Sequence, residues 1–231
     1  GHYGFFSLYA LNAGAKTVHV IEPSHENYKI LSKNLRGFSN VEKYNLALDK
    51  DMGEKEFLLV GPSSTNSFYE SYNTNNENPT SLGQTKTVQV NTVAFDQFIK
   101  NNNIHRLDAI KIDCEGAEWD IFPTISDKFL KHKVRKISAE LHQFNNEQDL
   151  EYHYKRSEEL EQRLVSLGFD VERNHIKSSQ PDENGLGQLW AKRYPKIKIV
   201  HMLCTTEGQR EKESIKHLHE LCKISGWVYE Q

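Results

Sequence analysis

Cysteine is scarce in this sequence, and the residues that occur form no metal-binding or disulfide pattern. Cys114, Cys204 and Cys222 stand far apart in the 231-residue chain, without any CxxC pair. Neither a disulfide framework nor a zinc site is indicated, and this usage is typical of a reducing compartment. No apolar run approaches the roughly 20 residues of a membrane span, and nothing at the start resembles a signal peptide. We therefore expect a soluble, cytoplasmic protein with no membrane partner.

The sequence also lacks an excess of positive charge and the common nucleotide-binding loops. Its net charge of -3 and isoelectric point of about 6.4 give no general attraction to nucleic acid, although a local basic patch remains open. No G-x-x-x-x-G-K-[ST] loop occurs, and only Gly1 and Gly4 stand where a dinucleotide fold has G-x-G-x-x-G. We expect no nucleic-acid partner. The incomplete glycine motif also disfavours a nicotinamide dinucleotide as cofactor.

The length suits one sizeable domain followed by the start of another. Tyr194-Pro195 marks the boundary, so we expect a domain over 1–193 and a further α/β unit over 194–231 that is too short for its own core. Gly1 to Gly4 leads straight into a helical pattern, as though the strand before it were missing. Residues 61–86, rich in Ser, Thr, Asn and Gly, form an unusually long insertion.

Strand and helix patterns alternate along the chain. The predicted strands are 17–21, 41–48, 53–60, 87–90, 109–112, 134–141, 169–173 and 186–192, and the predicted helices are 5–11, 24–36, 93–99, 117–122 and 148–167. This order predicts an α/β fold with a mostly parallel twisted sheet, helices on both faces and a closing antiparallel strand. We expect 18–21, 109–112 and 136–141 to be parallel strands of one sheet. The residues that suit a helix packed on a sheet are Phe5, Phe6, Leu8, Tyr9 and Leu11.

The chain is organised around the stretch 107–119. Its apolar run over 109–112 predicts a largely buried strand, and Asp113 and Glu115 crowd the carboxyl end of that strand. A carboxylate near a core is costly unless it is paired or solvated, so these acids should meet a partner. The alternative is a solvated turn in which Glu118 stabilises the amino end of the next helix.

Three predicted strands end in acids: Glu22, then Asp113 with Glu115, then Glu140 with His142. Open α/β sheets bind ligands outside the carboxyl ends of their strands, so the three ends together indicate a site. The alternative is that each acid only caps the next helix. An acid at the position of Glu22 suits the two hydroxyls of a ribose, which implies a nucleoside-containing cofactor.

Five motifs carry a resemblance to a known family. They are His-Tyr-Gly-Phe-Phe-Ser-Leu (2–8), Val-Ile-Glu-Pro-Ser-His-Glu-Asn-Tyr (20–28), Tyr-Asn-Leu-Ala-Leu (44–48), Asn-Ser-Phe (66–68) and Ile-Lys-Ile-Asp-Cys-Glu-Gly-Ala-Glu (110–118). In order and spacing they resemble the FkbM family of S-adenosylmethionine-dependent methyltransferases over about residues 1–192. The resemblance implies a Rossmann-like class I methyltransferase fold, S-adenosylmethionine as cofactor and O-methylation of a sugar, glycan or other small-molecule hydroxyl.

The resemblance also implies roles for single residues in cofactor binding. Gly4 would belong to the cofactor loop, Glu22 to the ribose contact, and Asn45 with Ala47 to the adenosine wall. Asp113 would lie near the methionine part of the cofactor. One departure is that the family's loop normally begins with Asp-x-Gly on the first strand, and this chain starts just after that position.

Methyl transfer to a hydroxyl requires alignment of donor and acceptor and removal of a proton. His142 is the candidate base, because the ordinary pKa of histidine near 6.5 suits that role. Asp113 and Glu140 are the other catalytic candidates. The alternative for His142 is a structural histidine at the sheet edge whose hydrogen bonds are met by its neighbours. With Glu115 these residues could gather a hard divalent cation, but no spacing is diagnostic, so no metal ligand is predicted.

The remaining histidines and the tail leave other functions open. His153, His175, His217 and His219 are expected at the surface, because no acid or cysteine recurs at ligand spacing. A non-catalytic binding module and a nucleic-acid or protein methyltransferase are the alternative functions, although the Asp/Asn-Pro-Pro-Tyr of amino-directed enzymes is absent at 113–116. Residues 196–231 vaguely resemble the start of a nucleotide-sugar glycosyltransferase, which would place a fused or adjacent domain of that kind beside methyl transfer.

Overall fold

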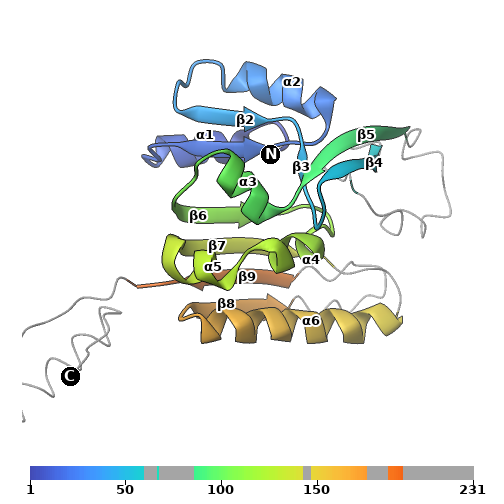
Figure 1. Ribbon diagram of the computed structural model, residues 1–231, viewed down its shortest axis with the longest axis vertical. Coiled ribbons are helices and arrows are strands. Elements are labelled where there is room, and N and C mark those ends of the chain that lie inside the picture. The colour runs from blue at the N-terminus through green and yellow to red at the C-terminus, as the bar shows by residue number, and fades with distance from the viewer. Residues whose placement is uncertain (60–66, 68–85, 143–146, 176–186, 195–231) are drawn as a thin grey trace, which may run out of the picture.

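The computed structural model describes residues 1–59, 67, 86–142, 147–175 and 187–194 (Figure 1). The elements are α1 (Phe5–Asn12), β1 (Val18–Ile21), α2 (His25–Asn34), β2 (Val41–Tyr44), β3 (Ala47–Leu48), β4 (Gly53–Leu59), β5 (Lys86–Val93), α3 (Phe95–Asn101), β6 (Leu107–Ile112), α4 (Glu118–Ile121), a 3₁₀ helix (Phe122–Thr124), α5 (Asp127–Lys133), β7 (Val134–Leu141), α6 (Glu147–Ser166), β8 (Asp170–His175) and β9 (Gly187–Lys192). Apart from residues 67, 86 and 194, the long insertion and the predicted second unit lie outside the described residues.

The described strands form three sheets. β1 pairs with β2, β5 lies between β3 and β4, and the third sheet has the order β6-β7-β9-β8. β6 and β7 are parallel, whereas β9 is antiparallel to β7 and β8, so the predicted closing antiparallel pair is confirmed. Figure 1 shows the third sheet continuing away from β2 in that order, with α6 beside β8.

The prediction that β1 shares a sheet with β6 and β7 is wrong for the described residues. β1 forms its ladder with β2, from Val18 opposite Val41 to Ile21 opposite Tyr44, and β6 forms its ladder with β7. No described strand bridges β1 and β6, so the expected single sheet is divided, although the α/β class is confirmed. Ile21 and Tyr44 nevertheless pack against the main core, and the Tyr44 ring meets Phe98 of α3 edge-on at 4.8 Å.

The strand predicted over 41–48 is also divided. β2 ends at Tyr44 and pairs with β1, whereas β3 begins at Ala47 and pairs with β5. Between them, the amide Nδ2 of Asn45 donates to the carbonyl oxygens of Glu22 and Pro23 at 2.9 and 3.0 Å. This side chain ties the end of β2 to the end of β1 where the chain changes sheets.

The main core holds the third sheet against helices α3, α5 and α6. Its fully buried side chains include Leu130 of α5, Leu141 of β7, Leu164 of α6 and Leu189 of β9. Each such leucine contributes about 1.5–3 kcal/mol relative to an exposed one. This packing fixes the position of Leu141 at the end of β7, and His142 is the next residue.

Two predictions about burial are wrong. In β6 only Ile112 is buried and Ala109 is exposed, because β6 has a single described strand neighbour. On α1 the prediction is wrong for Phe5, Phe6 and Tyr9, which are more than half exposed. It is confirmed for Leu8 and Leu11, which pack against the cluster around Leu31 and Leu35.

Helix ends follow local sequence signals. The Ser24 hydroxyl accepts a hydrogen bond from the Asn27 N–H at 3.3 Å, which confirms the predicted start of α2. Gly168, just after α6, has a φ of 87°, the left-handed conformation that ends many helices. None of the described helices combines the length and apolarity needed to cross a bilayer.

Candidate functional site

A tight turn follows β6 and brings its acids toward β7. Glu115 and Gly116 have φ angles of 51° and 103°, so the chain makes two consecutive left-handed steps, of which the first is unusual for a residue with a side chain. The Ser67 hydroxyl donates to the Glu115 carbonyl at 2.7 Å. The next element, α4, begins at Glu118, whose carboxylate accepts from the N–H groups of Cys114 at 2.6 Å and Gly116 at 3.0 Å. Glu118 therefore stabilises the turn by accepting hydrogen bonds from two of its backbone N–H groups.

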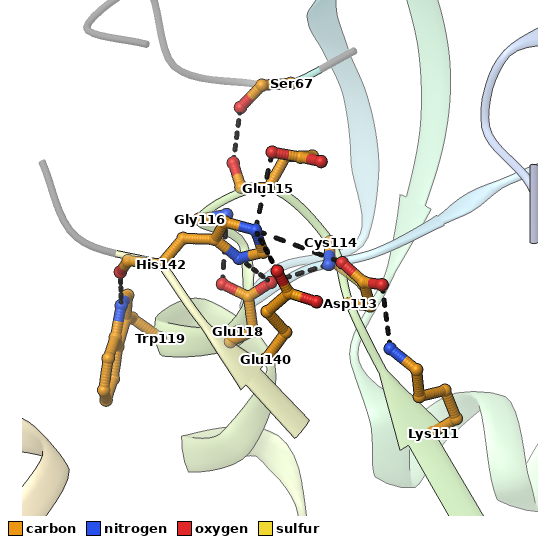
Figure 2. A network of polar contacts seen from close by, with 10 residues as sticks. All are labelled: Ser67, Lys111, Asp113, Cys114, Glu115, Gly116, Glu118, Trp119, Glu140 and His142. Atoms are coloured by element: carbon orange, nitrogen blue, oxygen red, sulfur yellow. Dashed lines mark hydrogen bonds and ion pairs between the residues drawn. The ribbon is translucent and has the colours of Figure 1, made fainter. Parts of the chain in front are cut away.

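His142 follows β7 and lies against this turn. Its side chain is buried, with the residue 2% exposed, and its carbonyl oxygen accepts from the Trp119 indole N–H at 2.8 Å. Its Nδ1 atom lies 3.0 Å from Oε1 of Glu118, which is completely buried. Figure 2 shows the imidazole of His142 among the side chains of Asp113, Glu115, Glu118 and Glu140.

The second ring nitrogen of His142 faces three further acids. Nε2 lies 3.5 Å from Glu115, 3.8 Å from Glu140 and 4.0 Å from Asp113 (Figure 2). Lys111 pairs with the other oxygen of Asp113 at 2.8 Å. We call the set of Asp113, Glu115, Glu118, Glu140 and His142 the His142 carboxylate group.

These acids change the protonation of the site. Burial is the largest influence on the pKa of His142 and lowers it, but the hydrogen bond and charge of Glu118 and the charges of Glu115 and Asp113 outweigh burial and raise the pKa to about 9. Burial, opposed by His142 and reinforced by the neighbouring acids, raises the pKa of Glu115 to about 7. At neutral pH His142 is therefore mainly an imidazolium, in contrast to the ordinary histidine expected from sequence.

Burial also raises the pKa of the Cys114 thiol to about 12. The thiol stays neutral at physiological pH, and because the thiolate is the reactive form, Cys114 is unsuited to act as a nucleophile.

The structure brings together the three predicted catalytic residues, His142, Asp113 and Glu140. Sequence reasoning missed the contact between Glu118 and His142, because it assigned Glu118 only to the amino end of a helix. A signal was present in the spacing: Glu118 begins a helix directly after the turn that bears Asp113 and Glu115, so its side chain can reach back into that turn.

His153 corrects a second expectation. It was predicted at the surface, but it is 1% exposed and its ring meets Trp119 edge-on at 5.3 Å. The spacing of His153, Ser157, Leu160 and Leu164 puts all four on one face of α6, and all are buried. The buried stripe of α6 therefore includes a histidine and a serine that the apolar pattern alone did not reveal. His217 and His219 lie outside the described residues, and so does the side chain of His175.

The predicted cofactor residues Glu22 and Asn45 lie together at the ends of β1 and β2. Glu22 is buried, and its carboxylate accepts from Ser24 N–H at 2.9 Å and from His2 N–H at 2.5 Å. Glu22 thus connects the amino-terminal turn to α2, and a ribose at this carboxylate would share it with these donors.

Gly4 and Ala47 have clear packing roles. Gly4 has a φ of 86°, and a Cβ atom there would lie 3.2 Å from Leu35, so the turn packs tightly on α2. Ala47 is buried with Phe57 and Val90. An open cavity of about 310 Å³ lies beside Asn45 and is lined also by Pro23 and His25, but it does not extend to the His142 carboxylate group.

Three atoms of the site lie close enough to approach one cation. Oxygens of Asp113 and Glu115 and a nitrogen of His142 all lie within 4.8 Å of one another. The ion pairs of His142 with these acids account for the same arrangement without a metal, so we assign no ion to it.

A family model matches most of the chain. The model of the methyltransferase FkbM domain matches residues 1–171, which include Glu22, Asn45 and the whole His142 carboxylate group. Comparisons with curated proteins and with solved structures gave no match.

Proposed function

Because the chain belongs to the FkbM methyltransferase family, we propose that it methylates a hydroxyl oxygen of a sugar, a glycan or another small molecule, with S-adenosylmethionine as donor. The observation that carries this proposal is the His142 carboxylate group, in which one imidazole nitrogen faces three acids at the ends of β6 and β7. A hydroxyl loses its proton when its oxygen is methylated, and this group contains the proton acceptors that such a step needs.

The chemistry of the predicted cofactor residues fits S-adenosylmethionine. When bound, this cofactor supplies a methyl group on a positively charged sulfur. The Glu22 carboxylate is an acceptor that suits the ribose hydroxyls, and Asn45, fixed to the carbonyls of Glu22 and Pro23, stands beside it for the adenosine. The carboxylate of Asp113 suits the ammonium group of the methionine part. The turn at Gly4 would belong to the cofactor loop, and buried Ala47 would support the adenosine wall.

His142 is the proposed proton acceptor in the transfer. With the cofactor bound, the acceptor oxygen would receive the methyl group that the cofactor supplies, and Nε2 of His142 would accept the hydroxyl proton. Asp113 and Glu140, which lie 4.0 and 3.8 Å from Nε2, stabilise the imidazolium that results. The same acids keep His142 protonated at neutral pH, so the step requires prior loss of that proton.

A methyl-transfer assay separates this function from its alternatives. The full chain would be incubated with isotopically labelled S-adenosylmethionine and either methyl glycosides or simple amines, while calorimetry measures binding of S-adenosylhomocysteine. We expect binding of S-adenosylhomocysteine and labelled methyl ethers of the glycosides. Label on amines alone would favour a protein or nucleic-acid methyltransferase, and absence of binding would favour a non-catalytic module.

A further inference from the structure

We propose that Glu118 is the positioning residue of the site: it keeps the proton of neutral His142 on Nδ1 and thereby makes Nε2 the atom that receives the acceptor's proton. The inference deepens the proposed function and rests on it for the reaction. Its own evidence is the arrangement of two buried side chains.

Glu118 is built into the turn as a fixed acceptor. Its side chain is completely buried, and two backbone N–H groups, from Cys114 and Gly116, donate to its two oxygens. The imidazole of His142 is the third group at hydrogen-bond distance, 3.0 Å from Oε1. An ionised carboxylate has no proton to give, so Nδ1 must be the donor in this contact.

This contact determines what the opposite nitrogen can do. A neutral imidazole carries one proton, and a proton held on Nδ1 leaves the lone pair on Nε2. The other acids around the ring, Asp113, Glu115 and Glu140, all lie on the side of Nε2 at 3.5–4.0 Å. Lys111 pairs with Asp113 on this side of the ring. Glu118 therefore sets the orientation and tautomer of the ring, whereas the other acids contribute charge.

A second contact prevents the backbone of His142 from shifting away. The Trp119 indole donates to the His142 carbonyl at 2.8 Å, and the guanidinium of Arg156 lies 4.3 Å from the Trp119 ring centre. Glu118 and Trp119 are adjacent in α4, so one short helix holds both the side chain and the main chain of His142.

The tautomer of His142 in the unaltered chain gives the first test. Nitrogen NMR shifts distinguish the two neutral forms, and the signal is assigned by its loss in His142→Gln. Above the titration of His142 we expect the form protonated on Nδ1. A neutral form protonated on Nε2 would overturn the proposal, and this measurement needs no variant of Glu118.

A matched pair of variants gives the second test. Glu118→Gln and Glu140→Gln each remove one negative charge near the ring, but Glu118 lies 3.0 Å from Nδ1, whereas Glu140 lies 3.8 Å from Nε2. We expect the pKa of His142 to fall from about 9 toward 6.5 in Glu118→Gln and to fall less in Glu140→Gln. Equal falls in the two variants would mean that charge alone, and not positioning by Glu118, governs His142. If Glu118→Gln does not fold, the tautomer of His142 measured in the unaltered chain tests the proposal by itself.

Both readouts are independent of the methyl donor and the acceptor. Failure of the predicted tautomer would refute the role of Glu118 while leaving methyl transfer possible. Absence of methyl transfer in a chain with the expected tautomer would instead refute the proposed function.

Discussion

Nδ1 of His142 lies 3.0 Å from Oε1 of Glu118, although the two residues are 24 positions apart in sequence. His142 directly follows β7, and Glu118 begins α4. Both side chains are buried, and the contact turns the opposite nitrogen of the ring toward Asp113, Glu115 and Glu140. A histidine held in this way has a defined proton-accepting atom and a raised pKa. These two properties lead to predictions that separate binding, catalysis and stability.

Replacement of His142 by alanine should separate binding from rate. The proposed base is not a cofactor contact, so S-adenosylhomocysteine affinity should change little, whereas the transfer rate should fall about 10²- to 10⁴-fold, the usual contribution of a positioned base. Calorimetry and a labelled-methyl assay on the same preparation measure the two effects. A variant with most of its activity would show that alignment alone drives the transfer or that a carboxylate takes the proton.

Replacement of Glu22 by alanine should weaken cofactor binding. Loss of hydrogen bonds to a charged acceptor costs roughly 1.5–3 kcal/mol in binding free energy. Because Glu22 also accepts from Ser24 N–H and His2 N–H, the thermal midpoint of the variant must be measured alongside its affinity. Glu42→Ala, at an exposed position of β2, is the control. An affinity within twofold of the unaltered chain, with a lowered midpoint, would assign Glu22 to support of the turn and α2 alone.

The raised pKa of His142 predicts a pH dependence of stability. The folded-state pKa of about 9 exceeds the ordinary 6.5, so protonated His142 stabilises the fold fully below about pH 6.5, and this contribution is lost as pH rises through 9. The shift corresponds to about 3 kcal/mol in the free energy of unfolding. Urea unfolding at pH 6 and pH 9.5 should show the loss in the unaltered chain and a smaller one in His142→Gln. Equal pH dependence in both chains would contradict the assignment.

Removal of metal should not affect the transfer rate. His142 lies beside Asp113 and Glu115, and Lys111 pairs with Asp113, so these cations offset the two carboxylates without a metal ion. Treatment with EDTA, followed by its removal, should leave the rate unchanged. A rate that is lost and then restored by Mn²⁺ would instead make Asp113, Glu115 and His142 metal ligands.

Local signals in the sequence predicted much of the site. The acids at strand ends, the serine cap of α2 and the closing antiparallel strands were all found because each depends on neighbouring residues or on a strand's own pattern. The convergence of Asp113, Glu140 and His142 followed from the rule that parallel strands share an edge, which β6 and β7 obey.

What sequence missed depends on contacts between distant residues. The pairing of Glu118 with His142 requires α4 to pack against the end of β7, which no local pattern specifies. The apolar pattern of β1 predicts a strand, but it does not specify the strands with which β1 pairs. In the described residues β1 pairs with β2 and not with β6. Phe5 and Tyr9 are exposed because tertiary packing selected another face of α1, even though their apolar character suggested burial.

The most direct test of the account is the dependence of the methyl-transfer rate on pH, measured with saturating S-adenosylmethionine. Only neutral imidazole accepts a proton, so the rate should rise with pH through about pH 9 and level off above it, and this rise should be absent in His142→Ala. A rise centred near pH 7 that disappears in Glu115→Gln would identify Glu115 as the base instead. A rate that is flat from about pH 6 to 10 would contradict general-base catalysis by His142.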